Sequence, residues 1–196
     1  ESNFIDKRKN EAIKLFSRTM IDTATGQMLD IQKEDALMTA KLKTARYTIS
    51  GPLQLGAILG GASHLFSNLA QFGESLGIAF QIRDDIIGTF GAVKDIGKSN
   101  FTDIQEAKRT LLVWYAYNHA NRKDKLLIKR IMENKVTKNT ELIKIRSIIT
   151  HTGSLAYAQE QIKYLYTQAL NQIRSLNMNQ KYQQTLDNFS QKILKI

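Results

Sequence analysis

The apolar residues of this chain recur at intervals of three and four positions over most of its length. Near the N-terminus, one stripe of this kind follows a single helical face: Ile13, Phe16, Met20, Ala24 and Met28. Positions with this spacing share one face of a helix, which predicts an amphipathic helix. No alternating strand pattern of useful length and no internal repeat occurs. The predicted fold class is therefore all-α, a helical bundle.

The first half of the chain contains signals that interrupt or bend helices. A shorter helical segment is predicted at about 35–50, and SGPL (50–53) interrupts or kinks it because proline disturbs a helix. Gly60 and Gly61 either break a helix or allow close packing. A second apolar series then leads into residues 80–88: Leu65, Leu69, Phe72, Leu76 and Phe80.

The second half is predicted to begin with a loop at 91–102, GAVKDIGKSNFT, which lacks helical periodicity. Thr102 and Gln105 resemble a capping box that opens a helix over 103–120. Further helices are predicted at 123–134, 139–151, 154–176 and 180–194. Their plausible N-caps are Asn139, Ser154 and Asn179.

Length and composition fit one α-helical domain over residues 1–196, or a piece of a larger protein. Hydrophobic residues make up 42% of the chain, which is ordinary for a protein that buries a core. Cysteine is absent, which excludes disulfides and thiolate metal sites. Residues 47–73 carry no charge, but Pro52, His64 and several amides favour a buried helical hairpin over a membrane span. No signal peptide is visible, and we expect a cytoplasmic protein without an integral membrane span.

The formal net charge of +10 favours an anionic partner. Nucleic acid, an anionic membrane surface and phosphorylated small molecules all satisfy this condition. A basic nucleic-acid module would bind with a steep salt dependence, but no DNA-binding motif and no interleaving of aromatic and basic residues supports it. We therefore expect no nucleic-acid partner.

The stretch FQIRDDIIG (80–88) places two adjacent acids, Asp84 and Asp85, in an apolar run. Buried carboxylates are costly unless a cation or strong donors satisfy them. Oxygen ligands alone suit a hard ion such as Mg²⁺, which often combines one or two carboxylates with water and phosphate oxygens. The alternative to a metal site is that the helix leaves the core here and water solvates the two acids.

Cationic residues surround this pair in the sequence. Lys98 lies in the following loop and Lys108 in the next helix, while Lys41, Lys43 and Arg46 lie upstream. Magnesium on one side and lysines on the other would form a clamp for a diphosphate, although each lysine alone is more often a surface residue.

The order of these motifs resembles that of the trans-isoprenyl diphosphate synthases, or polyprenyl synthetases. The matching segments are GQMLD (26–30), KTARYTISGPLQLGA (43–57), FQIRDDIIG (80–88) and GKSNFTDIQEAKRTLL (97–112). The resemblance implies a Mg²⁺-dependent condensation of isopentenyl diphosphate with an allylic diphosphate through an allylic carbocation. It also implies an isoprenoid-synthase helical bundle and a homodimer.

Carried over by position, the resemblance assigns Asp84 and Asp85 to Mg²⁺ and three lysines to the diphosphate: Lys43, Lys98 and Lys108. Thr44 and Gln81 would face the carbon from which diphosphate leaves, and Gln27 would line the same cavity. Phe80 would pack near the homoallylic substrate, or would simply belong to the core.

Two departures from the family pattern matter. The second aspartate-rich motif, usually DDxxD, reads DDIIG here, with Gly88 at the last acid, so weaker metal affinity is expected. The first aspartate-rich motif and its arginine pair are absent, so the chain resembles the C-terminal half of a synthase and should be inactive alone. Either it belongs to a longer enzyme or a partner supplies the other half. The alternative function is a degenerate, non-catalytic subunit that binds or regulates a prenyl synthase. Product chain length cannot be inferred.

Overall fold

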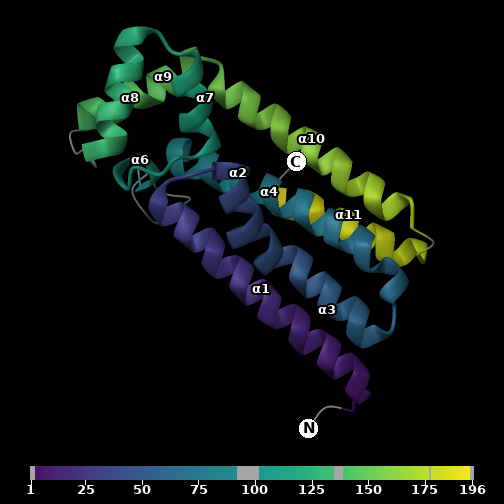
Figure 1. The fold of residues 1–196 in the computed structure, drawn as a ribbon. Coiled ribbons are helices and arrows are strands. Elements are labelled where there is room, and N and C mark those ends of the chain that lie inside the picture. The colour runs from purple at the N-terminus through teal and green to yellow at the C-terminus, as the bar shows by residue number, and fades with distance from the viewer. Residues whose placement is uncertain (1–2, 92–101, 135–138, 177, 195–196) are drawn as a thin grey trace. The chain divides into compact units, whose positions relative to one another are not determined.

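The computed structural model describes residues 3–91, 102–134, 139–176 and 178–194, and within these ranges it contains helices and no strands (Figure 1). This confirms the predicted all-α class. In chain order the elements are α1 (Asp6–Gln32), α2 (Ala36–Thr39), the π-helix η1 (Ala40–Ser50), α3 (Gly51–Gly60), the short 3₁₀-helix η2 (Ser63–Leu65), α4 (Phe66–Phe90), α6 (Thr102–Gln105), α7 (Leu111–His119), α8 (Arg122–Asn134), α9 (Asn139–His151), α10 (Ser154–Arg174) and α11 (Gln180–Leu194).

Contacts between residues divide the chain into two compact units. The first comprises Glu1–Leu29, Leu37–Gln81 and Lys163–Ile196, and the second comprises Asp30–Ala36 and Ile82–Ile162. Each unit has its own buried apolar residues. Those of the first include Ile49, Phe72, Leu76, Ala79 and Ile173, and those of the second include Ile104, Leu112, Ile131, Leu142 and Ile149.

The predicted apolar stripe of α1 lies on the exposed face of this helix. Ile13 is 62% exposed and Met28 is 59% exposed, and Phe16 and Met20 are also exposed. The residues that α1 buries are small or polar: Ala12, Thr19, Asp22 and Gly26. The periodicity therefore predicted the helix correctly but gave no information on which face is covered.

The π-helix η1 is the main departure from regular α-helix in the first unit. A π-helix has i→i+5 hydrogen bonds and is rare beyond single turns. The predicted interruption at residues 50–53 is a change of helix type, because η1 ends at Ser50 and α3 continues directly from Gly51. Pro52 occupies the first turn of α3, the part of a helix that tolerates proline best. Gly61 ends α3 with φ 72°, a left-handed conformation that favours glycine.

Two glycines of α4 allow its backbone to pack directly on η1. A Cβ added at Gly73 would lie 2.7 Å from Ser50 N, and one added at Gly77 would lie 2.5 Å from Ala45 Cβ. The Ser50 hydroxyl donates to Ala70 O at 3.2 Å across the same contact. This close approach sets the distance between η1 and the first-unit part of α4.

The predicted helix over 103–120 is wrong, because the chain forms the short helix α6 and then a separate helix α7. Between them Ala107 has φ 53°, which no continuous helix contains. The α7 helix starts instead at Thr110, whose Oγ1 accepts from Val113 N at 3.3 Å as an N-cap.

The last four helices begin and end within two residues of the predicted bounds. Asn179 caps α11 as expected, with its Oδ1 accepting from Lys181 N at 2.9 Å. Ser154 is the first residue of α10, and its buried hydroxyl donates to Leu112 O at 2.6 Å. In the first unit, Tyr166 of α10 donates to Asp187 of α11, which lies beside it (Figure 1). Among the described helices, none combines the length and the hydropathy needed to cross a bilayer.

Candidate active site

The first unit brings together two predicted site residues that lie far apart in the sequence. The Thr44 hydroxyl of η1 donates to Gln81 Oε1 of α4 at 2.6 Å. Both side chains are partly buried, so water competes weakly for this bond. The bond fixes the direction of the Gln81 carbonyl dipole and leaves the lone pairs of the Thr44 oxygen available.

The GQ segment of α1 lies against the residue that precedes Thr44. A Cβ added at Gly26 would lie 2.5 Å from Lys43 N and 2.9 Å from Leu42 Cβ. Only glycine permits this approach, because the nearest atom belongs to the backbone and has no alternative rotamer. The next residue of α1, Gln27, is exposed, and Lys43 is half-buried. The structure thus places the GQ and KT motifs side by side.

A charge network holds η1 between α1 and α4. Arg46 Nη1 lies 2.6 Å from Asp22 Oδ2 and Arg46 Nε lies 2.8 Å from Glu74 Oε1. Lys41 Nζ lies 2.8 Å from the other oxygen of Glu74. Burial lowers the pKa of Arg46, but the hydrogen bonds to Glu74 and Asp22 outweigh this effect, so the pKa lies above its ordinary value.

The π-helical spacing explains how two cations of η1 reach one carboxylate. Lys41 and Arg46 are five residues apart, which on an α-helix would place them about 140° apart around the axis. The i→i+5 ladder of η1 brings such residues onto nearly the same face, where both contact Glu74. Both cations are therefore engaged by carboxylates of the protein, although the sequence placed them near the expected diphosphate.

The second unit contains the aspartate pair at the C-terminal part of α4. Asp84 is exposed and Asp85 is half-buried. Burial raises the pKa of the Asp84 carboxyl above its ordinary value, and the charge of Asp103 adds to this. Lys108 and Arg83 oppose the shift by attraction. The carboxyl group of Asp84 is thus influenced by three charged neighbours.

Lys108 lies in the turn between α6 and α7 and is bound to acids. Its Nζ lies 2.6 Å from Asp103 Oδ1 and 3.4 Å from Glu106 Oε2. Burial lowers the pKa of Lys108, but its bonds to Asp103 and the charge of Glu106 leave the pKa above its ordinary value. The ammonium group is charged at neutral pH, as a diphosphate ligand would require.

The donor chemistry of this region fits a hard cation only in a limited way. Among the described residues, no group of three or more acidic or histidine side chains is arranged to hold a metal ion. Magnesium commonly takes one or two protein carboxylates and completes its octahedron with water and substrate oxygens. Asp84 and Asp85, adjacent on α4, could supply that number.

Two further residues, Phe80 and Lys98, were predicted to belong to the site. Phe80 is half-buried on α4, between the fully buried Ala79 and the contact of Gln81 with Thr44. Lys98 lies in the predicted loop at 91–102, and residues 92–101 are outside the described ranges.

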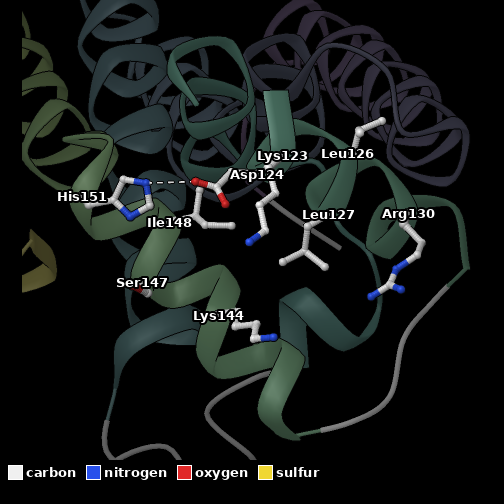
Figure 2. Close-up of a pocket in the computed structure, with 9 residues that line it drawn as sticks. All are labelled: Lys123, Asp124, Leu126, Leu127, Arg130, Lys144, Ser147, Ile148 and His151. Carbon is white, nitrogen blue, oxygen red and sulfur yellow. Dashed lines mark ion pairs between the residues drawn. The ribbon is translucent and has the colours of Figure 1, made fainter. Parts of the chain in front are cut away.

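A cavity of about 490 Å³ in the second unit involves none of the predicted site residues. It lies between α8 and α9, and Figure 2 shows the amino groups of Lys123 and Lys144 directed toward it. Arg130 is paired with Glu141, and His151 Nε2 lies 3.3 Å from Asp124 Oδ2. The floor is apolar, but the cationic groups on its rim are exposed, so we assign it no role in the site.

Sequence reasoning missed three features of this region. They are the π-helix η1, the Arg46 network and the Asp103–Lys108 pair. A signal for the last existed, because the segment TDIQEAK (102–108) places an acid and a lysine five residues apart.

Comparisons with known proteins agree with this architecture. A sequence model described as polyprenyl synthetase matches residues 2–149. A geranylfarnesyl diphosphate synthase of Aeropyrum pernix is 34% identical over 167 residues, covering 81% of this chain and 51% of that protein. A geranylgeranyl diphosphate synthase of Saccharolobus solfataricus is 32% identical over 162 residues, covering 82% and 48%.

Solved structures give the same result. A geranylgeranyl pyrophosphate synthase of Corynebacterium glutamicum, whose crystal contained isoprenyl diphosphate and magnesium, superposes with a TM-score of 0.88 at 27% identity. The superposition covers 98% of this chain and 57% of that one. The helices and the ordered motifs therefore define an isoprenoid-synthase fold. The chain belongs to the polyprenyl synthetase family, and it spans about half the length of the curated relatives it matches.

Proposed function

We propose that this chain carries the C-terminal half of the active site of a Mg²⁺-dependent trans-isoprenyl diphosphate synthase. The reaction would join isopentenyl diphosphate to an allylic diphosphate, in the manner of the geranylgeranyl and related synthases of the family. Membership of the family supports the class of reaction. The hydrogen bond between Thr44 and Gln81 is the single observation that carries the proposal for this chain.

The Thr44–Gln81 pair would act on the carbon that loses diphosphate. When the allylic C–O bond ionises, positive charge develops on that carbon, and fixed oxygen dipoles stabilise developing charge without reorganising. The Thr44 hydroxyl donates a hydrogen bond to Gln81 Oε1, so the carbonyl dipole of Gln81 is held in one orientation. Gln27 and Phe80 would line the adjoining space and exclude water, which otherwise quenches the cation.

The departing diphosphate accumulates negative charge, and cationic groups would have to stabilise this charge on the side away from the reacting carbon. Lys43, Lys98 and Lys108 would contact it, and Asp84 and Asp85 would hold Mg²⁺. When bound, Mg²⁺ would neutralise negative charge that accumulates on the leaving group. The double bond of isopentenyl diphosphate then attacks the cationic carbon, and loss of a proton yields the elongated allylic diphosphate.

The proposal is tested by measuring incorporation of labelled isopentenyl diphosphate into prenyl product. We expect no product from this chain alone, and product when it is joined to, or mixed with, an N-terminal half that carries a first aspartate-rich motif. Thr44→Val keeps the shape but removes the hydroxyl, and should lower kcat about tenfold or more, given the usual cost of a lost electrostatic stabiliser. Thr48→Val, at an exposed position of the same helix, is the matched control. Unchanged turnover in Thr44→Val would refute the assignment.

A non-catalytic subunit is the second candidate, because Gly88 replaces the third acid and the chain spans half a synthase. This candidate predicts that the chain forms a complex with a complete synthase and changes its rate or product length. It also predicts that Thr44→Val leaves that effect intact. The two candidates therefore differ in their response to the same substitution. Homodimerisation, expected from the family resemblance, is measured by light scattering during size-exclusion chromatography.

A further inference from the structure

One side of helix α8 exposes a leucine among cations. The helix holds five cations against two acids in thirteen residues. Its buried side carries Ile128 and Ile131. On the opposite side Leu126 is 61% exposed. Arg122 and Lys129, four residues before it and three residues after it, share its helix face and are also exposed.

Helix α7 adds two aromatic side chains next to this side of α8. Trp114 and Tyr117 are three residues apart, so they share a face of α7, and they are 53% and 40% exposed. Lys125 of α8 connects the two helices, because its Nζ lies 5.8 Å from the centre of the Tyr117 ring in a cation–π contact. The aromatic pair and the cations of α8 therefore adjoin. We call these six side chains the basic–aromatic face: Trp114, Tyr117, Arg122, Lys125, Leu126 and Lys129.

The acids of α8 do not neutralise this face. Asp124 lies 3.3 Å from His151 of α9, and Glu133 pairs loosely with Lys129 at 3.8 Å. Within the ranges that the structure describes, the other two cations of the face have no carboxylate partner. An anionic partner would therefore meet positive charge that the protein itself leaves uncompensated.

The mixture of side chains distinguishes between classes of anionic partner. Nucleic acid would use the cations and the aromatic rings, but an exposed leucine offers no flat surface on which a base could stack. The core of a protein interface is depleted of charged residues, whereas here cations flank the leucine on its own helix face. At an anionic bilayer, tryptophan and tyrosine lie at the level of the headgroups, leucine enters the acyl region, and lysine and arginine contact the lipid phosphates. The bilayer surface uses every side chain of the face.

We propose that the basic–aromatic face docks this protein on the surface of a bilayer that contains anionic phospholipids. Each cation near such a surface raises partitioning by about a factor of five. Trp114, Tyr117 and Leu126 add the burial of apolar surface that is otherwise in water. The contact is peripheral, because side chains enter the interface and no helix crosses it. The inference does not depend on the proposed function, since it uses none of the residues of the candidate active site.

Trp114 reports on the contact directly, because the chain contains no other tryptophan. The chain is titrated with vesicles of phosphatidylglycerol and phosphatidylcholine in equal amounts, and with vesicles of phosphatidylcholine alone. We expect the anionic vesicles alone to move the Trp114 emission to shorter wavelength, lipids brominated in their acyl chains to quench it, and added salt to weaken the binding. Equal binding to neutral vesicles would overturn the inference. Binding that leaves the Trp114 emission unchanged would place the contact on another face and would also overturn it.

Substitutions separate the face from the general positive charge of the chain. Arg122→Gln combined with Lys129→Gln removes two charges beside Leu126 and should lower the partition coefficient, measured by vesicle sedimentation, about 25-fold. Lys181→Gln combined with Lys192→Gln removes the same charge from exposed positions of α11 and should lower it less than about threefold. Leu126→Gln keeps every charge and should lower it about tenfold. Circular dichroism at 222 nm verifies that each variant is folded. A charge variant that binds like its control, or an unchanged Leu126→Gln, would refute the face.

Competition distinguishes a membrane from a nucleic acid. Polyuridylate is added to the chain bound to anionic vesicles, at an equal concentration of phosphate. We expect the Trp114 emission to stay shifted, because polyuridylate offers no acyl region for the apolar side chains. Full reversal of the shift would assign the face to nucleic acid and overturn the inference.

Discussion

Replacing Arg46 with methionine should weaken the first unit more than any exposed charge substitution on the same helices. Arg46 bonds to Asp22 and Glu74, which are only 13% and 24% exposed. Methionine preserves much of the apolar stem and removes both charged bonds. The two carboxylates would then each lose one cation while remaining partly out of water.

The magnitude follows from the partners that remain. A charge-assisted hydrogen bond contributes about 1.5–3 kcal/mol. Arg46 itself is 31% exposed, Asp22 keeps Arg18 at 3.3 Å, and Glu74 keeps Lys41 at 2.8 Å, so solvent and the second cations offset part of the loss. We therefore expect a decrease of about 2–3 kcal/mol in the free energy of unfolding, or about 4–12 °C in Tm.

The measurement is urea unfolding at pH 7 followed by circular dichroism at 222 nm, with amide hydrogen exchange of η1 as a local readout. Arg18→Met is the matched control, because Arg18 is 73% exposed and contacts the same Asp22. Its expected cost is below about 0.5 kcal/mol, as for other surface ion pairs. If Arg46→Met costs no more than this control, the network does not hold η1 in place.

Three further outcomes are expected. Gly77→Ala should lower the free energy of unfolding by about 1–3 kcal/mol, because the added Cβ would meet Ala45. Gly56→Ala, whose Cβ meets no atom within 4 Å, should raise the free energy of unfolding by up to about 1 kcal/mol. The midpoints of urea unfolding distinguish the two variants, and a stabilised Gly77→Ala variant would contradict the packing of α4 on η1. Asp84→Asn should stabilise the chain at pH 7 by a few tenths of a kcal/mol after solvent screening, because the raised folded-state pKa means that folding disfavours the charged form. That gain should vanish as the pH falls below the ordinary Asp pKa of about 3.9, and a loss of stability at pH 7 would refute the sign. Thr110→Ala should cost about 1 kcal/mol by removing the N-cap of α7, measured by thermal unfolding against Thr110→Ser, and an unchanged Tm would contradict the cap.

The sequence predicted most helix bounds because capping residues and apolar spacing are local properties. The helices after Asn121 illustrate this, since each begins near a polar cap and ends near a turn signal. The predicted helix over 103–120 failed for the opposite reason. Ala107 is a strong helix former in isolation, and its left-handed conformation is imposed by the return of the chain that pairs Asp103 with Lys108.

The candidate site was predictable as a set of motifs and not as a geometry. The order of Lys43, Thr44, Gln81 and the aspartates predicted the family, and the Thr44–Gln81 contact agrees with a shared site. The hydrogen-bond register of η1 cannot be inferred from residue types, because its composition would equally suit an α-helix. The packing of the Asp103 side chain against Gly88 could not be predicted either, since a glycine in the sequence does not indicate which residue occupies the space beside it.

The i→i+5 ladder of η1 has a consequence for how this segment tolerates changes in length. A π-helix contains more residues per turn than an α-helix, so the loss of one residue could be absorbed by a local return to α-geometry. Side chains on either side of such a deletion would keep their faces, whereas the same deletion in a continuous α-helix would turn them by about 100° relative to each other. If the lost residue lay between Lys41 and Arg46, these two would become four residues apart on an α-turn and would still share one face. Single-residue deletions within residues 40–50 should therefore be tolerated better than deletions within the neighbouring α-helices.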